Sequence, residues 1–179
     1  MTETLEQLKY PIGKFALPTS YSPSEIQQWI DIIEQLPVKM RNAVTGLKDE
    51  QLDTAYRDGG WTIRQVVHHV ADSHVNCYCR IKLILTEENP AIRPYLEAKW
   101  AEVKEAKTAP VEISLNILDA IHKRMVIALR NITIEDLERT YFHPENKQTN
   151  PLKALIALYA WHSRHHLGHI TELIKRKGW

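Results

Sequence analysis

The stretch Trp161-His162-Ser163-Arg164-His165-His166-Leu167-Gly168-His169 decides the fold, and four of the nine histidines of the chain lie in it. Around it, apolar and histidine side chains recur at alternating spacings of three and four residues: Leu152, Leu155, Tyr159, His162, His166, His169 and Leu173. Such spacing is typical of the core-facing stripe of a helix in a bundle. Three histidines therefore take the places of core residues in succession.

Histidines on a core-facing stripe need partners, because each buried imidazole brings a ring N–H and a lone pair. His162 and His166 are four residues apart, so both rings lie on one face of the helix and can converge on a single ion. The H-E-x-x-H motif of zinc proteases uses the same spacing, but its glutamate is absent here, which excludes that class. The sequence therefore predicts a metal site inside a helical bundle.

A third ligand has to come from another helix, and the segment after Trp61 offers two candidates. His74 continues the apolar line of Ile63, Val67 and Val70, whereas His69 lies on the neighbouring line. Spacing alone leaves His69 and His74 as equal alternatives.

The remaining polar residues are predicted to have ordinary roles. His68, Arg64 and Asp72 fall on the polar face of the same segment, where we expect solvent. His122 is expected to be a satisfied core histidine and His143 a loop residue. Asp72 and Glu172 are expected to be solvated helix residues, so no catalytic acid or base is assigned.

Four long helices follow from start and stop signals. The sequence has no alternating strand pattern, so the fold class is predicted as an all-α four-helix bundle. Ser22-Pro23-Ser24-Glu25 and Thr62 with Gln65 form capping boxes, a third helix begins near Pro110, and Asn150-Pro151 caps a fourth. Pro37 should open the first helix locally. The connections 47–61, 89–110 and 132–149 are long, so at least one is expected to be a crossover along the bundle.

Composition predicts one domain over residues 1–179, with residues 1–20 as an extended arm. The 23 basic and 22 acidic residues are interspersed, so we expect no nucleic-acid partner. The sequence has neither an apolar run of about 20 residues nor the core of a signal peptide. We therefore expect a cytoplasmic protein without a membrane partner.

Two motifs are similar to the signatures of the DinB-like superfamily: Trp61-Thr62-x-Arg64-x-Val66-x-x-His69-x-x-Asp72 and His162-x-x-x-His166. Tyr10-Pro11-Ile12-Gly13-Lys14-Phe15 and the Gly59-Gly60-Trp61 turn narrow the resemblance to its YfiT subgroup of metal-dependent hydrolases, relatives of bacillithiol transferases. The resemblance spans the chain and implies a bundle with zinc or nickel on His69, His162 and His166. It also implies a homodimer.

Three neutral imidazoles leave an ion with an open position, as in catalytic zinc sites. Water bound there would ionise near pH 7, which favours hydrolysis of a small-molecule substrate. Two alternatives remain open. A low-molecular-weight thiol such as bacillithiol could bind the open position in a thiol S-transferase, or the protein could be a non-catalytic metal-binding stress protein.

Overall fold

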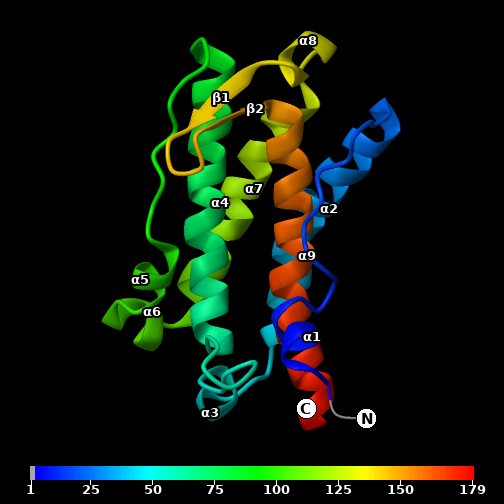
Figure 1. The fold of residues 1–179 in the computed structure, drawn as a ribbon. Coiled ribbons are helices and arrows are strands. Elements are labelled where there is room, and N and C mark those ends of the chain that lie inside the picture. Colours follow the sequence, from blue (N-terminus) through cyan, green and yellow to red (C-terminus); the bar gives the residue numbers. More distant parts are fainter. Residues whose placement is uncertain (1–2) are drawn as a thin grey trace.

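The computed structural model describes residues 3–179 as a bundle of four long helices with small additions (Figure 1). The long helices are α2 (Pro23–Val44), α4 (Ile63–Thr86), α7 (Val111–Arg130) and α9 (Leu152–Lys177). The short elements are α1 (Leu5–Lys9), α3 (Asp49–Leu52), α5 (Glu97–Ala101), α6 (Lys104–Thr108), α8 (Ile134–Leu137), β1 (Thr140–His143) and β2 (Gln148–Pro151). None of the described helices is both long and apolar enough to cross a bilayer.

The all-α four-helix bundle is confirmed by the four long helices, and capping geometry confirms two of the predicted helix starts. Ser22 caps α2 in a box with Glu25, and Thr62 caps α4 in a box with Gln65. In each box the two side chains satisfy N–H groups that have no partner within the helix. α7 begins directly after Pro110, as predicted.

Three details of the prediction are wrong. Asn150 does not cap α9, because it pairs with Tyr141 in a β-hairpin and the N–H of Leu152 donates to the carbonyl of Arg139 at 2.8 Å. The sequence does not predict the hairpin, since two strands of four residues are too short to produce an alternating pattern. The arm is not extended throughout, because Thr4 caps the one-turn helix α1.

The four long helices form a ring in which α2 and α4 each pack against both α7 and α9. α4 and α7 run in the same direction, and the segment between them descends along the bundle through α5 and α6 (Figure 1). This segment is the expected crossover. It packs against one flank of α4, where the carbonyl of Ala109 lies 3.1 Å from Nε2 of His68.

Two apolar clusters fill the bundle, and a layer of histidines separates them. One cluster contains Ile33 of α2, Cys77 of α4, Met125 of α7 and Ala160 of α9. Members of the other cluster lie later in the sequence on α2 and α9 and earlier on α4 and α7. Between the clusters lie the histidines of α4, α7 and α9: His74, His122, His162, His165, His166 and His169. The bundle therefore has two conventional cores and one polar layer between them.

Candidate metal centre

His69 of α4 and His162 and His166 of α9 form a compact group of imidazoles. One nitrogen of each ring lies within 4.8 Å of the corresponding nitrogens of the other two. The ring centroids of His162 and His166 are 4.4 Å apart, and that of His69 lies 4.7 Å from His166 and 5.4 Å from His162. The structure thus brings together the three residues implied by the resemblance.

Packing between α4 and α9 holds these rings in place. The indole of Trp61, just before α4, lies 4.6 Å from the ring of His69 and 6.3 Å from that of His166. His69 and His166 are buried, and His162 is half-buried. Trp61 therefore covers the group on one side and limits the access of water there.

Burial keeps the three imidazoles neutral. Desolvation, assisted by the nearby His169, lowers the pKa of His69 to about 4. Desolvation followed by the neighbouring histidines also lowers the pKa values of His162 and His166 well below 6.5. Neutral imidazole is the form that binds metal ions, since its lone pair is free.

A divalent ion fits this group of donors. Three neutral nitrogens suit zinc and nickel by ligand type. In addition, Nδ1 of His166 is buried and has no hydrogen-bond partner among the described residues. A buried ring nitrogen without a partner lowers the stability of the fold, and an ion bound to the group would remove this cost by supplying or rearranging its partners.

His74, the competing candidate from sequence, is not a member of this group. Its Nε2 lies 3.2 Å from Nδ1 of His162, on the far side of that ring from Nε2, and the side chain is fully buried. His74 therefore supports His162 from within the core. Periodicity could not separate His69 from His74, because both positions face the interior.

An open pocket of about 270 Å³ leads to two of the three histidines, His69 and His162. Its wall combines uncharged and charged side chains from α4, the α4–α7 crossover, the hairpin and α9: Ser73, Arg80, Pro94, Tyr95, Glu97, His143, Glu145 and Tyr159. The long connections thus help to wall a pocket, and Tyr95 is one of the aromatic residues involved. The pocket has room for a small molecule.

His143 is not a loop residue as predicted, because it ends strand β1 and lines this pocket. Its Nδ1 is buried without a hydrogen-bond partner in the described part of the chain. The hairpin places His143 and Glu145 opposite α4. These residues are too far from α4 in the sequence for residue spacing to predict that they meet. The β-prone residues Tyr141 and Phe142 were the available signal.

A second group, formed by His165, His166 and His169, shares His166 with the first. His169 Nε2 donates to the carbonyl of Lys9 at 3.0 Å, and His165 stacks on Trp161 with centroids 4.3 Å apart. These two rings are held by the N-terminal arm and by an aromatic neighbour. Unlike His69 and His162, they do not line the pocket between α4 and the hairpin.

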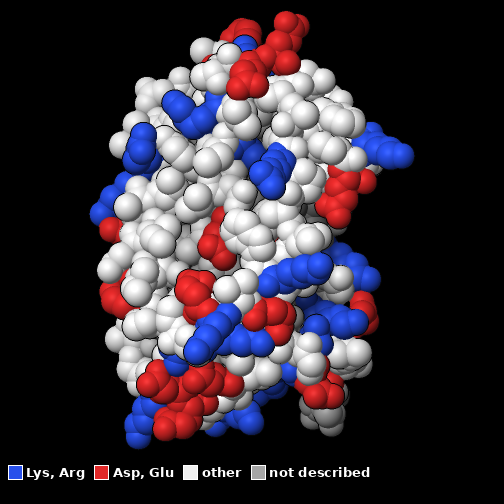
Figure 2. Space-filling view, turned by 90° about the vertical axis from the view of Figure 1, so that its left-hand side faces the viewer, with Lys and Arg blue, Asp and Glu red and all other residues white. Residues whose placement is uncertain are grey.

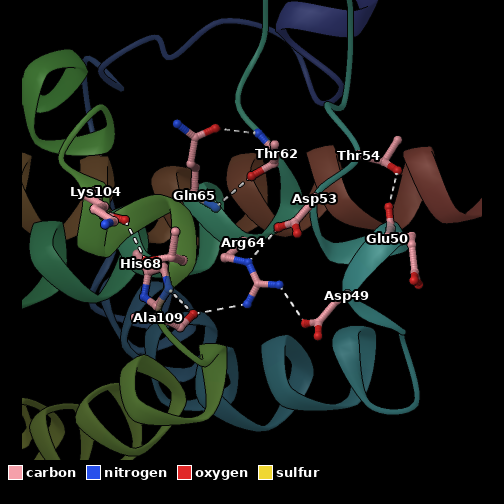
Figure 3. A network of polar contacts seen from close by, with 11 residues as sticks. Asp49, Glu50, Asp53, Thr54, Thr62, Arg64, Gln65, His68, Lys104 and Ala109 are labelled. Atoms are coloured by element: carbon pink, nitrogen blue, oxygen red, sulfur yellow. Dashed lines mark hydrogen bonds and ion pairs between the residues drawn. The ribbon is translucent and has the colours of Figure 1, made fainter.

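His68 and Arg64 are buried, which contradicts the prediction that they face solvent (Figure 3). His68 bonds to the hydroxyl of Ser114 at 2.7 Å and to the carbonyl of Ala109 at 3.1 Å. Arg64 is paired with Asp53 and Asp49, whose hydrogen bonds raise its pKa. The face of α4 that looks polar in the sequence is covered by α3 and by the end of the crossover.

Asp72 is also not fully solvated as predicted. It is half-buried, and burial, followed by the charge of Glu105, raises its pKa to about 6. Glu172 is half-buried too and lies 3.9 Å from Lys175 on the surface of α9.

Arg64 provides a first prediction. Its hydrogen bonds tie α4 to Asp49, Asp53 and the carbonyl of Ala109, and it is not among the residues that line the pocket. Arg64→Ala should lower the free energy of unfolding by about 1–3 kcal/mol through lost hydrogen bonds and packing. Denaturant titration measures this change. Metal content should stay the same as in the wild type, and a loss of metal at unchanged stability would contradict the anchoring role.

Charges of both signs mix on the face that carries the crossover. Figure 2 shows this face, and over its lower half the Lys and Arg side chains lie beside Asp and Glu. Surface ion pairs such as Lys107–Glu102 contribute to this pattern. The described part of this face therefore offers no uniformly basic surface.

The chain belongs to the DinB superfamily, whose family model matches residues 32–170. It is 49% identical over 176 residues to "Putative metal-dependent hydrolase YfiT" of Bacillus subtilis (strain 168), covering 98% of this chain and 99% of the relative. A relative of Bacillus cereus (strain B4264) with the same functional name is 53% identical over 175 residues, covering 98% and 100% of the two chains.

The fold of a solved relative agrees with these sequence matches. YfiT from Bacillus subtilis superposes with a TM-score of 0.94 at 50% identity, covering 97% of this chain and 99% of that chain. It is described as "a probable metal-dependent hydrolase with an unusual four-helix bundle topology". In this protein, the parallel pair α4 and α7, joined by a long crossover, departs from an up-down bundle.

Proposed function

We propose that this protein is a metal-dependent hydrolase that holds zinc or nickel with His69, His162 and His166. The observation that carries the proposal is the convergence of three neutral imidazoles, two of them buried and one half-buried, beside an open pocket. The names of its relatives support the same class.

The ion would supply Lewis acidity, which polarises a substrate carbonyl or makes water acidic near pH 7. The protein's part is to supply neutral donors, because an uncharged ligand set leaves the full positive charge of the ion for the reaction. The indole of Trp61 excludes water from one side of the site. Restricted access of water strengthens electrostatic interactions with a bound substrate.

A pocket of about 270 Å³ supports the proposal of a small-molecule substrate. Arg80 supplies a fixed positive charge to its wall, and Glu97 and Glu145 supply carboxylates. Polar groups of both signs suit a ligand that carries hydrogen-bonding groups as well as apolar surface. His143 and the two carboxylates are the side chains from which a proton donor or acceptor would be drawn.

The test uses metal-loaded protein and measures turnover of p-nitrophenyl acetate in buffer alone and with bacillithiol, glutathione or cysteine. Hydrolysis in buffer that is lost in His162→Ala supports the proposal. Consumption of the electrophile monochlorobimane only when a thiol is present would identify a thiol S-transferase instead. Metal binding without either reaction would favour a non-catalytic role.

Removal of the metal should leave the bundle folded, because the two apolar clusters pack without help from the ion. An ion at 100 times its dissociation constant adds about 2.7 kcal/mol to stability. For a protein of this size, chelation should therefore lower Tm by roughly 5–10 °C. Circular dichroism during EDTA treatment measures this, and loss of the helical signal at room temperature would make the site structural.

We propose a cytoplasmic homodimer, as the resemblance implies. Exposed isoleucines on α7, namely Ile113, Ile117 and Ile127, offer apolar surface that a second copy could cover. Analytical ultracentrifugation measures the mass in solution. A monomer at micromolar concentration would overturn the proposed assembly.

A further inference from the structure

A continuous row of hydrogen bonds crosses the bundle from α2 to the candidate metal centre. The carbonyl of Ile33 lies 2.7 Å from Nδ1 of His122, and Nε2 of His122 lies 2.9 Å from Nδ1 of His74. Nε2 of His74 then lies 3.2 Å from Nδ1 of His162. We call Ile33, His122, His74 and His162 the histidine chain.

The first member sets the direction of every bond in the histidine chain. A carbonyl oxygen can only accept, so Nδ1 of His122 must donate to Ile33 and carry the proton. A neutral His122 then accepts at Nε2, which requires Nδ1 of His74 to donate. By the same argument His74 accepts at Nε2 and Nδ1 of His162 donates. The lone pair of His162 is left on Nε2.

Pro37 explains why the carbonyl of Ile33 is free to accept. In a regular helix this carbonyl would bond to the N–H of residue 37, but proline has no N–H. Pro37 lies inside α2, and both it and Ile33 are buried. An interior proline normally costs a helix about 3 kcal/mol, so its place here calls for a reason. The bond from His122 supplies the missing donor.

We propose that Pro37, through the free carbonyl of Ile33, and the buried pair His122 and His74 act as positioning residues that fix His162 in the tautomer whose Nε2 is free to bind the ion. The inference rests on the proposed function, because it assigns a purpose to residues behind the same site. Ligating histidines commonly donate their other N–H to a fixed partner, which orients the ring. Here that partner is the neutral side chain of His74, whose orientation is set in turn by His122 and the carbonyl of Ile33.

The surroundings suit this role. His74 is fully buried, His122 is 2% exposed and their rings stack with centroids 4.8 Å apart. Tyr159 packs edge-on against His74 at 5.0 Å, which leaves that ring little freedom to flip. The other contact of His162 Nε2 is the hydroxyl of Ser73 at 3.5 Å, at the limit of a hydrogen bond. Among the residues that the structure describes, no stronger hydrogen-bond donor faces this lone pair.

The test reads the tautomers directly in the metal-free protein, by long-range 1H–15N NMR correlations of the histidine rings. All three histidines of the chain should be protonated on Nδ1 and unprotonated on Nε2 at pH 7.5. His162 protonated on Nε2, or a mixture of both tautomers, would overturn the proposal. Because no metal is present, this measurement is independent of whether the protein is a hydrolase.

Variants then connect the tautomer to metal binding. His122→Phe keeps the ring volume but leaves Nδ1 of His74 without an acceptor, so zinc and nickel affinity should fall 10–100-fold. His122→Gln offers an amide N–H to Ile33 and an amide oxygen to His74, and should recover most of that factor together with the wild-type tautomer of His162. Affinity is measured by competition with a chelator.

His68→Phe is the matched control. It also removes a buried histidine with two hydrogen-bond partners, and it lies on α4 like His74, but outside the histidine chain. Its metal affinity should equal that of the wild type even if its stability falls. Equal losses of affinity in His68→Phe and His122→Phe, or no recovery in His122→Gln, would show that the effect is general destabilisation and overturn the proposal. If NMR shows the proposed tautomers but the protein binds neither zinc nor nickel, the proposed hydrolase function is refuted. The hydrogen-bond geometry of the histidine chain would then stand without a role in metal binding.

Discussion

Replacing His162 by alanine should remove nearly all of the bound metal from the purified protein. The variant keeps only His69 and His166, and two donors do not make a tight site. The loss of affinity should exceed the 10–100-fold that is typical when only an outer partner of a metal ligand is removed. Elemental analysis after dialysis measures metal per chain. Full retention would contradict the assignment of His162 as a ligand.

His165→Ala is the control for this experiment. His165 neighbours His166 on the same helix and is equally buried, but its ring stacks on Trp161. Metal content should stay stoichiometric in His165→Ala. If it fell as far as in His162→Ala, the assignment of His69, His162 and His166 as the three ligands would be wrong.

The metal-free protein should unfold in mild acid, at a pH between about 5 and 6. Burial lowers the pKa values of His69, His122 and His169 to about 4 and that of His165 to about 3. In the unfolded chain these groups return to about 6.5 and take up protons that the folded protein excludes. Their contribution to stability is therefore fully present above pH 6.5 and is lost as the pH falls toward the folded values.

The size of this effect is comparable to the whole stability of a protein. At pH 5 each of the four histidines favours the unfolded state by about 2 kcal/mol, or on the order of 8 kcal/mol together. A typical folded domain has about 5–15 kcal/mol in total. His74, His162 and His166 act in the same direction. Bound metal opposes the effect, because it holds its ligands unprotonated.

Circular dichroism as a function of pH, with and without zinc, measures both midpoints. The midpoint of the metal-loaded protein should lie at lower pH than that of the metal-free protein. A metal-free protein that keeps its full helical signal at pH 4 would contradict the neutral burial of the histidine layer. The unperturbed pKa of 6.5 alone would have placed competition between protons and metal near pH 6; burial moves it lower in the folded state.

The fold was predictable where local chemistry determines structure. The capping boxes at Ser22 and Thr62 and the stripe through His162 and His166 depend on residues within a few positions of one another. The hairpin was not predictable in this way, since its strands are short and its pairing depends on the carbonyl of Arg139 and on α9. Burial of Arg64 depends on Asp49 and Asp53, which belong to a different helix and loop.

The candidate site was predictable to the level of its helices. Spacing identified His162 and His166 and narrowed the third candidate to two residues, and the resemblance indicated His69. The contribution of His143 depends on how the hairpin folds over α4. The bond between His122 and Ile33 could not be predicted, because Pro37 signalled an open carbonyl without indicating which distant donor would reach it.

The order of synthesis gives the packing of the arm on α9 a further meaning. The carbonyls of Lys9 and Gly13 accept hydrogen bonds from His169 and Trp161. The N-terminal arm can therefore form these bonds only after the ribosome has added about 150 further residues. At 5–20 residues per second, His69 precedes His162 by on the order of ten seconds. During that interval the nascent chain has only one of the three proposed ligands. Binding of an ion by all three proposed ligands would therefore have to follow translation of α9, and would be separated in time from the early folding of α2 and α4.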